Sequence, residues 1–62
     1  MIFRKGDIYK NTHSEVLIYI TEVIDNKYKL EWTNTDGSKI EKWYEHQFLS
    51  MSLNKGFIQN IN

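Results

Sequence analysis

The side chains of this 62-residue chain that could catalyse a reaction or bind a metal are two histidines, four serines and a set of carboxylates. His13 and His46 have no second histidine, cysteine or carboxylate at a ligand spacing, and Glu45 is only adjacent to His46. The serines lie in segments expected to be loops or turns, without a base to activate a hydroxyl nucleophile; they are Ser14, Ser38, Ser50 and Ser52. We therefore expect no enzymatic activity, no metal and no cofactor.

The carboxylates alternate with lysines rather than gathering in one place. Eight basic and eight acidic residues give a formal net charge of +0, so no whole-molecule field attracts nucleic acid or an anionic membrane. Cross-strand ion pairs on a solvated sheet surface explain the arrangement better than general acid–base chemistry. The residues concerned are Glu22, Glu31, Glu41 and Glu45 beside Lys27, Lys29, Lys39 and Lys42.

The length and composition predict one small domain over residues 1–62. A chain of this size buries only about 60% of the surface that its unfolded form exposes. There are no cysteines to add disulfides, so the two Trp, four Tyr and three Phe must supply much of the buried area. The longest apolar run, Val16–Ile20, is too short to span a bilayer, and the start lacks the apolar run of a signal peptide. We expect a cytoplasmic protein.

The elements that must position these residues are short strands. Tyr28, Leu30 and Trp32 fall at every second position with polar residues between them, which predicts a strand with one buried face and Leu30 at its centre. The same reasoning predicts five strands in all, at residues 8–10, 16–24, 27–33, 38–44 and 57–61, and the fold class is all-β.

Turns and one irregularity connect these strands. The spacing of Ile18, Ile20 and Val23, two and then three, predicts a β-bulge at Thr21-Glu22 that bends the strand. Asp25-Asn26 predicts a tight hairpin, and residues 34–37 predict a type I turn followed by a glycine in the left-handed region. We expect one helical turn near residues 45–49, with Phe48 or Leu49 pointing inward. Residues 50–56 are expected to be a polar loop anchored by Met51 and Leu53.

The central stretch, Tyr19 to Leu49, resembles the chromo and Tudor group of SH3-like barrels. The resemblance is carried by Glu22-Val23-Ile24-Asp25, by Tyr28-x-Leu30-x-Trp32, and by Trp43 with Leu49 six residues later. It implies a single five-stranded SH3-like barrel. Residues 50–62 contain Gly56 and are too short for the long C-terminal helix of a chromodomain, which favours a plain barrel.

The resemblance does not extend to methyl-lysine binding. Chromodomains that bind methylated lysine surround the cation with three aromatic rings. Trp32 falls at one cage position, but Ile18 and Thr35 fall at the other two. Trp32 is therefore expected to pack in the core with Tyr28 and Leu30.

The function expected from the sequence is binding to a larger protein. Consecutive strand residues point to opposite faces, so only one of Trp43 and Tyr44 enters the core. If the isoleucines of the first two strands face inward, Tyr9 and Tyr19 face outward and form with Trp43 or Tyr44 an aromatic surface of the kind found at binding hot spots. We expect a stand-alone adaptor or inhibitor, for which a phage or mobile-element origin would be suitable. The alternative for these rings is that they cover the ends of the barrel.

Nucleic-acid binding is the second hypothesis. Basic residues interleaved with aromatic ones can neutralise phosphates and stack on bases. Acidic residues interrupt this pattern, and a net basic balance is absent. The candidate contacts are Lys10, Lys27, Lys29 and Lys42.

Overall fold

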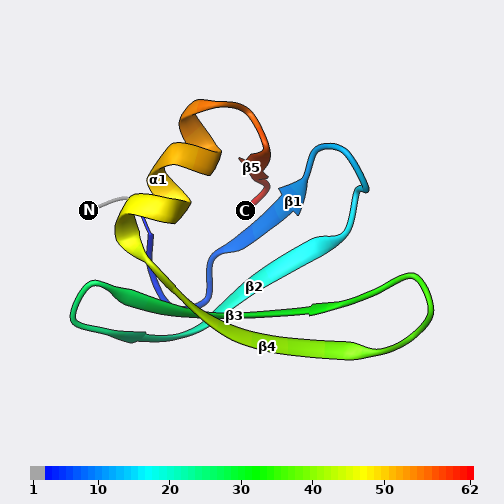
Figure 1. Cartoon of the computed structure of the whole chain (residues 1–62), viewed down its shortest axis with the longest axis horizontal. Helices are drawn as coiled ribbons and strands as arrows, with labels where there is room; N and C mark the ends of the chain where they lie inside the picture. The colour runs from blue at the N-terminus through cyan, green and yellow to red at the C-terminus, as the bar shows by residue number, and fades with distance from the viewer. Residues whose placement is uncertain (1–2) are drawn as a thin grey trace.

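The computed structural model describes residues 3–62, which form five β-strands and one α-helix (Figure 1). Residues 1 and 2, which the single-domain prediction includes, lie outside the described part. The elements in chain order are β1 (Ile8–Asn11), β2 (Leu17–Ile24), β3 (Lys27–Thr33), β4 (Lys39–Glu45), α1 (His46–Asn54) and β5 (Ile58–Asn60). The five predicted strands are confirmed, each within two residues of its expected ends.

The strands form one antiparallel sheet in the order β4-β3-β2-β1-β5. β4 and β5 are its two edges, and within residues 3–62 they do not pair with each other. The expected closure of a barrel is therefore not observed as strand pairing. α1 and β5 lie on the same side of the ribbon formed by β2, β3 and β4 (Figure 1).

A β-bulge in β2 keeps the apolar side chains of this strand on one face of the sheet. Ile20 lies opposite Leu30, but Glu22 lies opposite Lys29, so one extra residue is accommodated between them. After the bulge Val23 lies opposite Tyr28, on the same face as Ile20. The predicted bulge at Thr21-Glu22 is confirmed.

The core is formed by six buried side chains from five parts of the chain. Leu30 is buried as predicted, and Tyr28 precedes it on the same face. The Phe3 ring lies 5.6 Å from the ring centroid of Tyr28, and its edge-on packing is typical of aromatic pairs. The full set is Phe3, Tyr9, Ile20, Tyr28, Leu30 and Leu49.

The two hairpin turns have the expected geometry. Asp25 has φ 54° and Gly37 has φ 92°, both in the left-handed region. The Gly37 N–H donates to the carbonyl of Asn34 at 2.9 Å, which closes the second turn. The Asp36 carboxylate accepts hydrogen bonds from the hydroxyl and the N–H of Ser38, and these bonds lower the pKa of Asp36.

The helix is longer than predicted. α1 has nine residues, whereas the sequence predicted one turn and placed residues 50–56 in a loop. Leu49 is buried and Leu53, four residues later, is partly buried against the core, so both lie on one side of the helix. Met51 is 48% exposed and does not anchor this segment. Polar residues obscured this helix in the sequence, because these two leucines are its only apolar pair spaced four residues apart.

A Schellman motif ends α1. The Gly56 N–H donates to the Leu53 carbonyl at 3.1 Å, and the Phe57 N–H donates to the Ser52 carbonyl at 2.8 Å. Gly56 has φ 79°, which an L side chain rarely adopts. The motif turns the chain sharply and brings Phe57 back beside the helix.

We predict that Leu30→Ala lowers the free energy of unfolding by about 2 to 5 kcal/mol, because it leaves a cavity in the centre of the core. Urea denaturation followed by circular dichroism measures the change. The control is Ile24→Ala, since Ile24 is 56% exposed, and its cost is expected to be within about 0.5 kcal/mol. Equal effects of the two substitutions would contradict the described core.

Candidate binding groove

The two faces of the sheet differ in chemistry. The register places Tyr28, Leu30 and Trp32 of β3 on the same face as Tyr44, Lys42 and Ile40 of β4. We call this the inner face, because it carries the core and is partly covered by α1. The opposite, outer face carries the intervening residues of both strands, among them Lys29, Glu31, Glu41 and Trp43.

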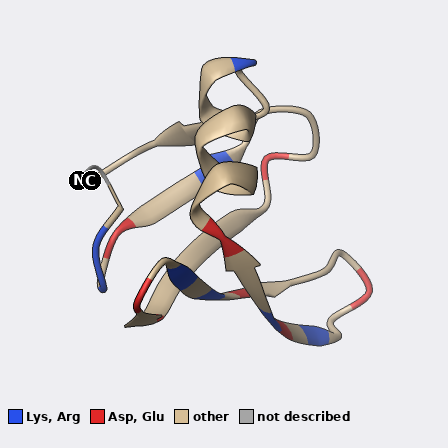
Figure 2. Cartoon of the chain, turned by 60° about the vertical axis from the view of Figure 1, so that its left-hand side comes forward, with Lys and Arg blue, Asp and Glu red and all other residues tan. Residues whose placement is uncertain are grey.

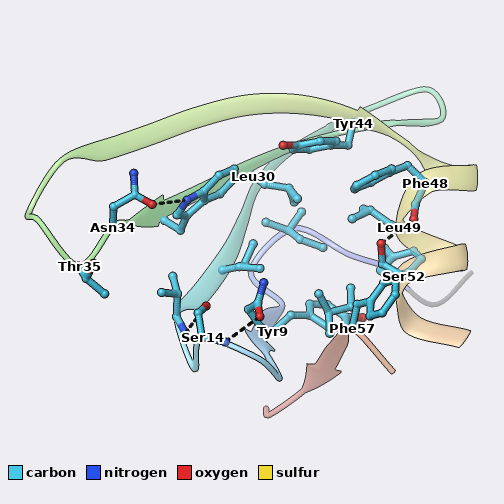
Figure 3. A pocket seen from close by; sticks show the side chains of 17 residues that line it. Tyr9, Ser14, Leu30, Asn34, Thr35, Tyr44, Phe48, Leu49, Ser52 and Phe57 are labelled. Atoms are coloured by element: carbon cyan, nitrogen blue, oxygen red, sulfur yellow. Dashed lines mark hydrogen bonds between the residues drawn. The ribbon is translucent and has the colours of Figure 1, made fainter. Parts of the chain in front are cut away.

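A groove with a volume of about 530 Å³ lies on the inner face (Figure 3). Its sides come from segments far apart in the sequence, with Tyr44 and Phe48 on one side and Phe57 on the other. Ile18, Leu30 and Trp32 contribute to its lining from the sheet. The groove lies between the ends of a sheet that does not close, so part of its lining remains open to solvent.

Three aromatic rings follow one another along this groove. The Tyr44 and Phe48 rings are stacked, with centroids 4.8 Å apart and planes 18° apart. Trp32 lies 6.4 Å from Tyr44 at 33°. The Trp32 Nε1–H donates to Asn34 Oδ1 at 3.1 Å, which fixes the orientation of the indole. We call Trp32, Tyr44 and Phe48 the aromatic row.

Most polar side chains around the groove already have partners within the protein. Asn34 also donates from its amide to Ser38 Oγ at 3.1 Å, and Ser52 Oγ donates to the Phe48 carbonyl at 3.0 Å. Asn11 Oδ1 accepts from the backbone N–H groups of His13 and Ser14. Among residues 3–62 no buried side-chain nitrogen or oxygen lacks a hydrogen bond. The groove therefore offers mainly apolar and aromatic contact.

The two histidines do not meet. His46 begins α1, where its Nδ1 lies 3.2 Å from the hydroxyl of Tyr28 and its ring packs on Phe3. His13 is exposed in the turn between β1 and β2. No cluster of three or more metal-binding side chains occurs in the part of the chain that the structure describes.

The predicted exposure of Tyr9 is wrong. Its side chain is 3% exposed and lies in the core, 5.6 Å from the Phe3 ring. β1 pairs with β2 so that Tyr9 lies opposite Ile18 on the inner face, while Ile8 lies opposite Tyr19 on the outer face. Ile8 and Tyr9 are both apolar enough for either side, so alternation alone did not determine which one faces inward. Burial, with a smaller contribution from the negative charge of Asp7, raises the pKa of Tyr9.

The other predicted aromatic contacts fall on two faces. Tyr19 and Trp43 are on the outer face and are 43% and 46% exposed. Tyr44 is half-buried on the inner face, in the aromatic row. The four predicted residues therefore do not form one cluster. Trp32 packs against the core, as predicted, but it is only partly buried and also lines the groove.

Phe48 and Phe57 are the groove residues that the sequence did not identify. They are 50% and 59% exposed. The sequence feature that could have indicated an exposed Phe48 is its position next to Leu49, since neighbouring helical residues cannot both point into the core. For Phe57 the corresponding feature is the preceding Gly56, the residue that turns the chain back.

The predicted basic contacts are dispersed among acids (Figure 2). Lys29 pairs with Glu41 at 3.3 Å, and Lys39 pairs with Glu31 at 3.3 Å. Partial desolvation acts to raise the pKa of Glu31, but the hydrogen bond and charge of Lys39 outweigh it and the net shift is downward. Lys27 lies opposite Glu45 in the register. Lys10 lies on the outer side of β1, opposite Leu17, and Lys42 lies on the inner side of β4. These lysines form no continuous basic surface.

No protein-family model, no curated protein and no solved structure matches this chain. α1, which is the single helix of residues 3–62, lacks the length and apolar character to cross a membrane. Function must therefore be inferred from the groove and the two faces of the sheet.

We predict that Tyr9→Ala and Tyr19→Ala differ strongly in stability, although both replace a strand tyrosine. Tyr9→Ala empties part of the core and is expected to cost about 3 kcal/mol or more. Tyr19→Ala removes an outer-face ring and is expected to cost less than about 1 kcal/mol. Thermal or urea denaturation measures the stability of the two variants. A larger loss of stability for Tyr19→Ala would show that Tyr9 does not face the core.

Proposed function

We propose that this chain is a non-catalytic protein-binding module that holds an apolar segment of a larger protein in the groove. The single observation that supports this most is the aromatic row together with Phe57, rings that line one groove and are not fully buried in a domain of 62 residues. A chain this small has few aromatic rings for its core, yet two phenylalanines are at least half exposed beside the groove. Aromatic side chains of this kind are enriched among the contacts that dominate binding energy.

The form of the groove favours a protein segment as the ligand. The groove is open to solvent along part of its lining rather than enclosed, so a segment of another protein can enter without unfolding of the domain. Most of its polar side chains are engaged within the protein, which leaves apolar and aromatic surface as its main contact.

The fold is consistent with the same proposal. The five strands, the bulge in β2 and the helix after β4 support an SH3-like barrel of the chromo and Tudor type that is left open between β4 and β5. Such small barrels serve many partners, so the type of fold alone does not select one. A module of this size would act in the cytoplasm as an adaptor or inhibitor by occupying a surface of a larger protein.

Nucleic-acid binding receives less support from the charges. Three outer-face or loop lysines are paired with glutamates, which reduces the positive potential available to phosphates. They are Lys5 with Glu22, Lys29 with Glu41, and Lys39 with Glu31. The groove itself is lined mainly by apolar and aromatic side chains.

We predict that peptides selected on the purified chain from a displayed library of random 12-residue sequences bind in the groove. Phe48→Ala and Phe57→Ala are each expected to weaken this binding by about 1 kcal/mol or more, roughly fivefold in Kd, because they remove desolvated rings. Titration calorimetry measures the affinities. The matched control is Tyr19→Ala, which removes an exposed aromatic ring from the outer face of β2, an interior strand of the sheet, and should leave Kd unchanged.

Three results would overturn the proposed function. The first is failure of the library to yield any binder, and the second is weakening by Tyr19→Ala alone. The third is micromolar or tighter binding to mixed-sequence DNA or RNA at physiological salt, with affinity that falls steeply as salt is raised.

A further inference from the structure

We infer that the bound segment is extended and adds as a strand to the free edge of β4, with an acidic side chain facing Lys42 between two apolar ones. This inference rests on the proposed function and names the form and chemistry of its partner. It follows from three features of β4. The strand has free backbone groups along one edge, it has side chains on the inner face beside the aromatic row, and one of these, Lys42, has no counter-ion among the described residues.

The free backbone groups of β4 can be identified from the register. Asn34 N–H donates to the Ser38 carbonyl at 2.8 Å, and His46 N–H donates to the Asn26 carbonyl at 2.8 Å. Both pairs continue the β3–β4 register, one at each end of the ladder. In an antiparallel ladder, hydrogen-bonded and non-hydrogen-bonded pairs alternate. Ile40, Lys42 and Tyr44 therefore bond to β3.

The alternate residues of β4 direct their backbone groups away from β3. These are Lys39, Glu41 and Trp43, whose N–H and carbonyl groups lie along an edge that has no neighbouring strand in residues 3–62. β4 has seven residues, whereas the other edge strand, β5, has three. A longer edge offers more hydrogen bonds to an added strand.

An added strand continues the two faces of the sheet. Its residues opposite Ile40, Lys42 and Tyr44 point to the inner face, beside the aromatic row, and its other residues point outward. Backbone pairing with β4 and insertion of side chains at the groove are therefore two parts of one binding mode.

The charge of Lys42 specifies which side chain is expected at the middle position of the bound segment. Lys42 is exposed on the inner face and makes no ion pair with any described residue, in contrast to Lys29 and Lys39 on the outer face. Its neighbours on that face, Ile40 and Tyr44, are apolar and half-buried. Opposite-charge and apolar cross-strand pairs stabilise a ladder. The complementary segment has the pattern apolar-x-acidic-x-apolar.

A second copy of this chain fits the edge less well. When the two-fold axis passes through residue 42, antiparallel pairing of β4 with itself places Lys42 against Lys42 on the inner face, and Lys39 against Glu45 on the outer face. With the axis at residue 41 it places Glu41 against Glu41, and with the axis at residue 43 it places Glu41 against Glu45. Like charges directly opposite one another destabilise a ladder. None of these registers places an acidic residue opposite Lys42 on the inner face, so a different protein that does so is the better partner.

Amide hydrogen exchange tests the pairing directly, with the library-selected 12-residue peptides as the probe. In the free chain the amides of Ile40, Lys42 and Tyr44 should exchange slowly, and those of Glu41 and Trp43 rapidly. On binding, exchange at Glu41 and Trp43 should slow at least tenfold. Backbone N-methylation of the peptide at the amides that face β4 should weaken binding tenfold or more, whereas methylation of alternate amides should not.

Charge reversal tests the specificity. The selected peptides should share the pattern apolar-x-acidic-x-apolar, and Lys42→Glu should weaken their binding at least tenfold. Changing the acidic peptide residue to lysine should restore it. The matched control is Lys55→Glu, since Lys55 is an exposed lysine at the end of α1, away from the groove; it should have no effect.

The outcomes separate this inference from the proposed function. If peptides bind and Phe48→Ala weakens them, but exchange at Glu41 and Trp43 is unchanged or Lys42→Glu has no effect, the inference is wrong and the groove proposal stands. If no peptide binds, both are wrong. Dimerisation of the free chain through β4, detected by ultracentrifugation together with protection of Glu41 and Trp43, would also overturn the inference.

Discussion

The extra residue between Ile20 and Glu22 is the constraint on which the arrangement of the whole sheet depends. β2 pairs with both β1 and β3, so its two faces define the two faces of the sheet. Strand side chains alternate strictly, and without the bulge Val23 would point to the same side as Tyr19. With the bulge, Val23 packs against the core from the same face as Ile18 and Ile20. One irregularity therefore lets an eight-residue strand support a continuous apolar face.

That apolar face is larger than the rest of this short chain can cover. Phe3 and Leu49 close the core over Tyr28 and Leu30. Beyond this core, the aromatic row runs from Phe48 of α1 through Tyr44 to Trp32, near the β3–β4 turn. β4 and β5 remain unpaired edges, and no further strand within residues 3–62 joins them. The groove and the free edge of β4 thus have a common origin in a sheet that curls without closing.

The parts of this fold that local chemistry determines could be predicted from the sequence. Asp25 and Gly37 adopt the left-handed conformations that their turn segments require, and Tyr28 and Leu30 follow a simple alternation. The side of β1 could not be predicted, because Ile8 and Tyr9 suit either face and the pairing with β2 decides between them.

The groove was beyond sequence reasoning for a different reason. Its lining comes from strands, a helix and the segment after it, and these meet only through tertiary packing. The length of the helix that contributes Phe48 was itself underestimated, because polar residues interrupt its apolar spacing. One of them, Ser52, is buried, and its hydroxyl donates to the Phe48 carbonyl. An aromatic surface was predicted from Tyr9, Tyr19, Trp43 and Tyr44, but of these only Tyr44 belongs to the aromatic row.

The most direct measurement of the central claim is a methyl NMR titration of the isotope-labelled chain with a library-selected peptide. Val16, Ile18 and Ile58 line the groove, whereas Leu17 and Ile24 are exposed away from it. We predict that the methyl signals of the first three shift on binding and show contacts to the peptide, while those of Leu17 and Ile24 remain unchanged. Shifts confined to Leu17 and Ile24 would contradict the account, because binding would then occur on the outer face of the sheet.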